Sequence, residues 1–173
     1  MGKPHVRIYT GEGAGKTLAA FGLALRAIGH GQKVVIVQFL KGRKDVGEYK
    51  VKERLSPNLE IYQFGREGFV SIRNPERVDH ELARKGIEFA KQVLQLKPDV
   101  LILDEVNLAA SLGLIEVKDV LELIEKAPDD MVIVLTGRYA PKEFIDVADL
   151  VTEMKKIKHP FDRGESAKKG REY

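Results

Sequence analysis

The chain has 173 residues, a length that fits one domain with a single hydrophobic core. Its 29 basic and 26 acidic residues give a net charge of +3 and are interspersed, which does not indicate a nucleic-acid-binding protein. The absence of cysteine excludes disulfides, thiolate metal ligands and thiol redox chemistry. No apolar run approaches the roughly 20 residues that span a bilayer, and the N-terminal residues do not resemble a signal peptide. We therefore expect a cytoplasmic protein with no membrane partner.

The first predicted structure is a strand, a glycine-rich loop and a helix. Residues 5–9 (HVRIY) form a β-prone run, residues 10–17 read TGEGAGKT, and an apolar helical pattern follows. Glycine at every second loop position allows positive φ angles, so that successive N–H groups face an anion at a helix N-terminus. This pattern is typical of a phosphate-binding loop, although Thr10 stands where the Walker pattern has its first glycine.

The loop predicts a nucleotide site with defined roles for its residues. Lys16 supplies a positive charge, and the Thr17 hydroxyl binds a magnesium ion that bridges phosphate oxygens. The residues that we expect to contact the nucleotide are Thr10, Gly11, Glu12, Gly13, Ala14, Gly15, Lys16 and Thr17.

A helix over residues 16–28 and a strand over residues 33–40 follow the loop. The helix has Leu18, Phe21, Leu25 and Ile28 at helical spacing, and we expect this stripe to pack on the sheet. The strand (KVVIVQFL) is almost continuously apolar, as in a strand covered on both faces. It ends in a basic loop that begins at Lys41, which either contacts phosphate or substrate at the carboxyl edge of the sheet or is a solvated charge run.

The next stretch predicts a strand over residues 59–64 and a loop over residues 65–70. The loop mixes glycines with an apolar tip at Phe69, which suits either a mobile segment over a site or a core contact. A helix then begins at Asn74-Pro75 and ends at Lys97-Pro98. Its predicted apolar stripe is Val78, Leu82, Phe89, Val93 and Leu96.

Residues 99–105 read DVLILDE, a buried strand that runs into two carboxylates. In a chain with a phosphate loop, this pattern is similar to a Walker B element, with Asp104 on the metal. Glu105 positions a water, holds the water shell of the metal, or only bonds nearby backbone. The alternative is an ordinary strand end with two N-capping carboxylates.

The remaining pattern completes an α/β protein. We expect a helix over 116–127, a strand over 131–135, a short helix over 141–147 and a strand over 150–154. Arg138 follows the strand over 131–135 at the carboxyl edge of the sheet and is placed to meet phosphates or a neighbouring subunit. Residues 155–173 form a basic, loosely ordered tail. Strands that alternate with helices predict one three-layer domain, residues 1–173, with a mostly parallel sheet.

Several motifs together resemble one family, the P-loop type of corrinoid adenosyltransferase. They are TGEGAGKT, VQFLKG, LDE, TGRYAP, ADLVTEM, KHPF and the closing KGREY, which cover nearly the whole chain. The resemblance implies a RecA-like P-loop NTPase fold and a homodimer. It also implies transfer of the 5′-deoxyadenosyl group of ATP to the cobalt of cob(I)alamin or a related corrinoid, with triphosphate leaving and magnesium, or manganese in its place, as the cation. Without cysteine or a flavin motif, the cobalt reductant is a separate protein.

The resemblance also assigns roles to particular residues. Lys16 stabilises the leaving triphosphate and Phe69 faces the corrin. Glu105, at the acidic strand end, is a third candidate catalytic residue. The chain departs from the family pattern at Val70-Ser71, where the family commonly has Thr-Trp, and at Ala14 and Leu18, where it usually has Lys and Thr. These departures concern substrate preference and nucleotide affinity.

Two other functions remain open from the residues alone. A P-loop ATPase or kinase would use Glu105 to orient the attacking group at the γ-phosphate. A nucleotide-switched binding module would use ATP to order residues 65–73 for a partner.

Overall fold

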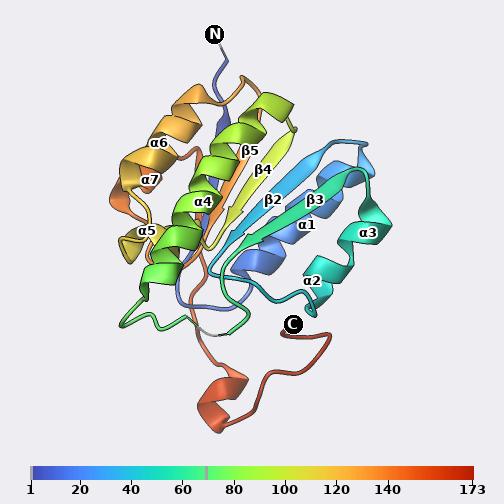
Figure 1. The fold of residues 1–173 in the computed structure, drawn as a ribbon. Helices are drawn as coiled ribbons and strands as arrows, with labels where there is room; N and C mark the ends of the chain where they lie inside the picture. The colour runs from blue at the N-terminus through green and yellow to red at the C-terminus, as the bar shows by residue number, and fades with distance from the viewer. Residues whose placement is uncertain (1, 69) are drawn as a thin grey trace.

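The computed structural model describes residues 2–68 and 70–173, which form three layers around one parallel sheet (Figure 1). The sheet has six strands in the order β3-β2-β4-β5-β1-β6, and every recorded pairing is parallel. The strands are β1 (His5–Thr10), β2 (Val34–Phe39), β3 (Leu59–Phe64), β4 (Val100–Asp104), β5 (Val132–Thr136) and β6 (Leu150–Glu153). The predicted three-layer α/β fold and parallel sheet are confirmed.

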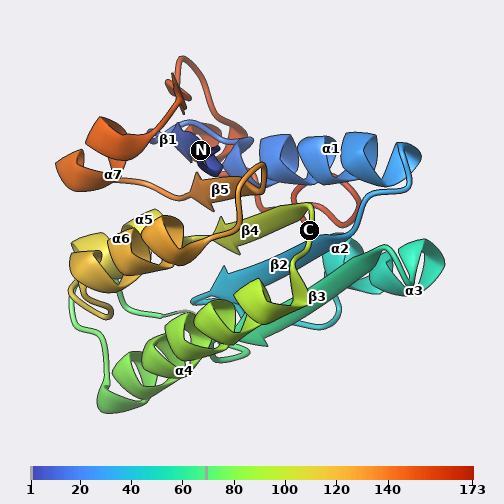
Figure 2. The ribbon, with the colours of Figure 1, turned by 90° about the horizontal axis from the view of Figure 1, so that it is seen from above.

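Helices cover both faces of the sheet, as the view in Figure 2 shows. The helices are α1 (Lys16–Gly29), α2 (Gly47–Lys50), α3 (Lys52–Leu55), α4 (Arg77–Val93), α5 (Val106–Ser111), α6 (Val117–Lys126) and α7 (Lys142–Val147). Helix α1 lies on one face with α2 and α3, whereas α4, α5 and α6 lie on the other. Two short 3-10 turns complete the elements, Leu94–Leu96 and Pro160–Arg163.

The strands in the middle of the sheet form the core because they are apolar on both faces. Every residue of β2 and of β4 is buried, as the continuous β-branched runs predicted. Edge strand β6 is exposed along its length. The carboxyl ends of the parallel strands therefore meet at one edge of a rigid sheet, where a ligand can bind.

Helix α1 packs on the sheet mainly through alanines; of the predicted stripe, Phe21 and Ile28 pack against the core, whereas the prediction is wrong for Leu18 and Leu25. Ala20, Ala24 and Ala27 are buried, whereas 68% of Leu18 and 60% of Leu25 are exposed. The small side chains let the helix axis approach the strands closely, and larger residues such as Phe21 and Ile28 pack at the flanks of this contact, only partly buried.

Helix α4 begins later than the sequence suggested, at Arg77. Glu76 and Asp79 form a reciprocal capping box, which satisfies the first N–H groups better than Asn74-Pro75 would. The buried face includes Ala83, Ile87 and Ala90. Val78 and Leu96 of the predicted stripe are exposed, and Leu96 lies in the 3-10 turn that follows the helix.

Two features at the carboxyl edge were not predicted from the sequence, namely helix α5 and the packing of the end of the tail. Helix α5 starts directly after Glu105, which is its N-cap residue, so that no loop separates the end of β4 from the helix. The tail leaves β6 at the same edge, passes beneath the strands and ends beside α2 (Figure 1). It is mostly exposed, as expected, but its end packs on the protein, with the Tyr173 ring 4.8 Å from the Arg43 guanidinium carbon.

Candidate active site

The glycine-rich loop lies between β1 and α1, and its glycines are required for two separate reasons. Gly11 and Gly15 have φ angles of 96° and 106°, which favour glycine. Gly13 instead lies against the end of β6, where its N–H donates to the Met154 carbonyl at 2.6 Å. A Cβ at Gly13 would lie 2.6 Å from that same oxygen. The last strand therefore supports the loop from behind.

Lys16 is buried, and its ammonium lies inside the loop. Its ammonium donates to the Gly13 carbonyl at 2.6 Å, and only 8% of the residue is exposed. Burial lowers the pKa of the Lys16 ammonium. The Lys16 charge is thus held at the centre of the loop, where phosphates would bind.

The other predicted loop residues lie around this centre. Thr10 ends β1, and its hydroxyl accepts a hydrogen bond from the Ala140 N–H at 3.2 Å, so the Walker glycine is replaced by a side chain that holds the loop after β5. Glu12 is exposed and accepts from the Tyr139 hydroxyl at 3.3 Å. Ala14 is also exposed.

Asp104 is the most completely bonded carboxylate of the site. It ends β4, is fully buried and accepts from Thr17 Oγ1 (2.9 Å), Thr136 Oγ1 (2.7 Å), Gln38 Nε2 (3.0 Å) and Lys41 Nζ (2.7 Å). Burial by itself would raise the pKa of Asp104, but the Lys41 charge and these hydrogen bonds hold it below its ordinary value. The predicted pairing of Thr17 with Asp104 is therefore present in the geometry.

Gln38 and Thr136 belong to the site although sequence reasoning did not select them. Gln38 holds Asp104 from the neighbouring strand, and Thr136 also accepts from the Glu105 N–H at 3.0 Å. Gln38 is the polar residue in the apolar run VVIVQF, and this interruption is a signal that could have identified it.

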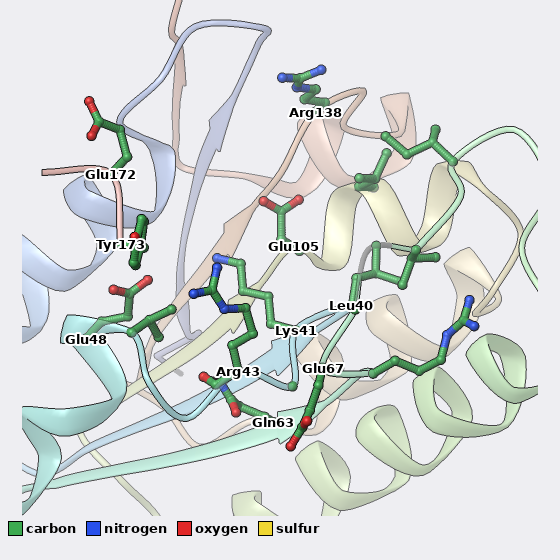
Figure 3. Close-up of a pocket in the computed structure, with 17 residues that line it drawn as sticks. Leu40, Lys41, Arg43, Glu48, Gln63, Glu67, Glu105, Arg138, Glu172 and Tyr173 are labelled. Carbon is green, nitrogen blue, oxygen red and sulfur yellow. Dashed lines mark hydrogen bonds between the residues drawn. The ribbon is translucent and has the colours of Figure 1, made fainter. Parts of the chain in front are cut away.

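A cavity of about 440 Å³ opens beside Lys41, whose ammonium contacts Thr17 at the end of the phosphate loop. Lys41, Glu105 and Arg138 line it together with the loops that follow β2 and β3, and Figure 3 shows that these side chains come from separate elements. Burial, and then the neighbouring Asp104 charge, raise the pKa of Glu105. The cavity thus has both charged and apolar walls.

Backbone strain gathers at this edge of the sheet. Leu40, Glu105 and Tyr139 have φ angles of 60°, 62° and 58°, a left-handed conformation that costs a side-chain-bearing residue about 1 kcal/mol or more. All three directly follow, or lie a few residues beyond, strands β2, β4 and β5. The strain fixes the direction in which each loop leaves the sheet, so Glu105 is aimed into the cavity.

Phe69, the residue expected to face the corrin, lies outside the described residues. Gly68 and Val70 on either side of it line the cavity. Arg43, Arg66 and Tyr173 also line the cavity, and sequence reasoning did not single them out.

The oxygen donors of this site fit a hard divalent cation. Thr17 and Asp104 present a hydroxyl and a carboxylate next to the phosphate loop, and Mg²⁺ prefers such ligands together with substrate phosphates and water. The described residues contain no group of three or more His, Cys, Asp or Glu side chains that would hold a metal by itself. Any metal at this place would therefore depend on phosphate oxygens.

The parallel sheet, the glycine-rich loop before α1 and the acidic end of β4 define a nucleotide-binding protein of the P-loop class. A sequence profile described as ATP:corrinoid adenosyltransferase BtuR/CobO/CobP matches residues 2–173. The chain belongs to this family, which confirms the resemblance seen in the sequence.

Characterised relatives agree with this assignment. A corrinoid adenosyltransferase of Sinorhizobium is 38% identical over 99% of this chain and 81% of its own length. One of Pseudomonas aeruginosa is 39% identical over 96% of this chain and 82% of its own. The corrinoid adenosyltransferase CobA of Salmonella typhimurium is 33% identical over 96% and 84%. None of the helices in the described part of the chain is long and apolar enough to cross a bilayer.

Proposed function

We propose that the protein transfers the 5′-deoxyadenosyl group of ATP to the cobalt of a reduced corrinoid and releases triphosphate. The observation that carries the proposal is the hydrogen bond of Thr17 to buried Asp104 at the end of the phosphate loop, with Lys41 joining both residues to the cavity of about 440 Å³ that it lines. Triphosphate in the loop would direct the attached adenosyl group toward this cavity. Membership of the ATP:corrinoid adenosyltransferase family supports the same reaction.

The chemistry asks the protein for orientation and charge stabilisation. The electron pair of cobalt(I) forms the bond to C5′ while the C5′–O bond breaks. The electron pair of the broken C5′–O bond leaves with the triphosphate. Lys16 and the loop N–H groups stabilise the charge that develops on the leaving oxygens. Magnesium, or manganese in its place, held by Thr17 and Asp104, would neutralise further phosphate charge.

The corrinoid would enter from the loop after β3. Val70 and Ile72 give the cavity apolar surface, and Glu105 and Arg138 also line it. Phe69 belongs to the same loop, and we propose from the sequence that its ring faces the corrin. Loss of the ring in Phe69→Ala would weaken corrinoid use and leave ATP affinity nearly unchanged.

A homodimer, a separate reductant and a cytoplasmic location complete the proposal. Exposed apolar side chains on α7 and β6 support self-association through this edge of the sheet, namely Ile145, Val147, Leu150 and Val151. Light scattering after gel filtration would give twice the chain mass for such a dimer. The chain has no cysteine with which to reduce cobalt itself.

The decisive experiment is an anaerobic assay with ATP, magnesium and chemically reduced cob(I)alamin. A light-sensitive alkyl-cobalt product, with triphosphate identified by ³¹P NMR, is the expected result. ADP and phosphate without a corrinoid product would instead indicate an ATPase in which Glu105 orients water.

A further inference from the structure

Lys41 occupies the place that the site offers to a cation. Its Nζ lies 2.7 Å from Asp104 Oδ2 and 3.1 Å from Thr17 Oγ1. These two residues are the same oxygen donors that fit a divalent metal. Lys41 reaches them from the loop after β2, and 29% of its side chain is exposed on the cavity side.

The surrounding charges explain why an ammonium is held there. Asp104 is fully buried, and a buried carboxylate without a counterion is strongly destabilising. Burial lowers the pKa of Lys41, but Asp104 and then Glu105 outweigh burial, so the net pKa lies above its ordinary value. The other charged groups that act on this cluster are Lys16, Glu48 and Arg138.

A divalent metal and the ammonium do not fit this place together. Magnesium binds oxygen at about 2.0–2.1 Å, whereas the ammonium already contacts both oxygens at 2.7 and 3.1 Å. A metal bound to the same atoms would lie almost against Nζ and repel it. The Lys41 side chain also lines the cavity, so it has an open direction in which to turn.

We propose that Lys41 is the built-in counterion of the nucleotide-free site, and that metal with nucleotide displaces its ammonium from Thr17 and Asp104 toward the phosphates. The exchange makes metal alone a weak ligand, because it competes with an attached cation. Nucleotide favours the exchange, since its phosphates accept the released ammonium. Metal and nucleotide therefore bind cooperatively, and each raises the affinity of the other by the same factor.

The test measures metal binding without turnover. Free Mn²⁺ is followed by electron paramagnetic resonance as it is titrated into the nucleotide-free protein. Wild type should bind weakly, and Lys41→Met should bind about tenfold more tightly, within the usual range of coupling between sites. Lys44→Met, which removes an exposed lysine from the same loop, should behave as wild type. Adding Asp104→Asn to Lys41→Met should abolish the gain.

Equal Mn²⁺ affinity in wild type and Lys41→Met, or weaker binding by the variant, would overturn the proposal. Because Lys41→Met leaves a buried carboxylate without its counterion, its folding is checked by circular dichroism. Lys41→Gln, which keeps a donor for Asp104 without the charge, replaces it in the same titration if folding fails. The proposal rests on the proposed function only for the nucleotide. If adenosyl transfer is not observed but the Mn²⁺ result holds, the proposed reaction fails and the cation exchange stands.

Discussion

At the scale of single residues, Lys16 should affect catalysis much more than folding. Its ammonium donates to the Gly13 carbonyl of its own loop, a contact that it can exchange for phosphate oxygens when nucleotide binds. Lys16→Ala should lower kcat by about 10²- to 10³-fold, the usual effect of removing one group that stabilises developing charge. Steady-state kinetics measure this, with the exposed Lys85→Ala as the control. Unchanged kinetics would mean that the loop does not bind the reacting phosphates.

Substitution by alanine should have opposite effects at Gly13 and at Gly22. In Gly13→Ala the new Cβ meets the Met154 carbonyl at 2.6 Å, which is backbone and cannot turn away. This variant should lose ATP binding, measured by calorimetry, and unfold at a lower temperature.

Gly22→Ala is the matched control, because no atom lies within 4 Å of its Cβ position on the exposed face of α1. It should stabilise the protein by about 0.5–1 kcal/mol, the helix-propensity difference, with ATP binding unchanged. Nucleotide binding by Gly13→Ala at wild-type affinity would show that the contact with β6 is dispensable.

At the scale of elements, the start of α4 holds the loop that walls the cavity. Arg66 donates to both carboxylate oxygens of Asp79 at 2.8 Å and to Glu76 at 2.9 Å. Asp79 is 2% exposed and also accepts the Glu76 N–H. The loop after β3 is therefore fixed at one end by a bidentate ion pair, a geometry available to arginine and not to lysine.

Arg66→Ala should lower the melting temperature and raise KM for the corrinoid severalfold, because buried Asp79 loses its partner and the loop is no longer held. Arg66→Lys should recover only part of the loss. Arg77→Ala removes an exposed ion pair with Glu81 on the same helix and should change neither quantity. Equal loss of ATP and corrinoid affinity in Arg66→Ala would argue against a local role of this ion pair.

The elements also show what the sequence can reveal. β-branched runs located the strands because a strand buried on both faces needs apolar residues at every position. Helix faces were less predictable, since α1 buries alanines and exposes Leu18 and Leu25. The phosphate loop and Asp104 could also be predicted, because each belongs to a short motif of neighbouring residues. The contacts of Asp104 with Gln38 and of Arg66 with Asp79 depend on how distant segments pack, which local patterns do not encode.

At the scale of the whole molecule, the tail brings Tyr173 to the cavity from the opposite side of the sheet (Figure 1). Its ring lies over the Arg43 guanidinium, a contact worth about 0.5–1 kcal/mol at an exposed site. Tyr173→Ala should therefore raise the KM for the substrate that binds in this cavity by about two- to fivefold, with little change in melting temperature. Tyr173→Phe keeps the ring and should match wild type. A difference between wild type and Tyr173→Phe would assign the effect to the hydroxyl instead of the ring.

The order of the strands also has a consequence for how the protein is made. β1 is synthesised first but pairs with β5 and β6, and the Gly13 N–H finds its partner only at Met154. A ribosome that adds about 5–20 residues per second needs roughly 7–28 s to travel from Gly13 to Met154. During that time the nascent chain carries the nucleotide loop without its support. ATP should therefore bind, and protect the chain from misfolding, only after β6 and Met154 have been synthesised.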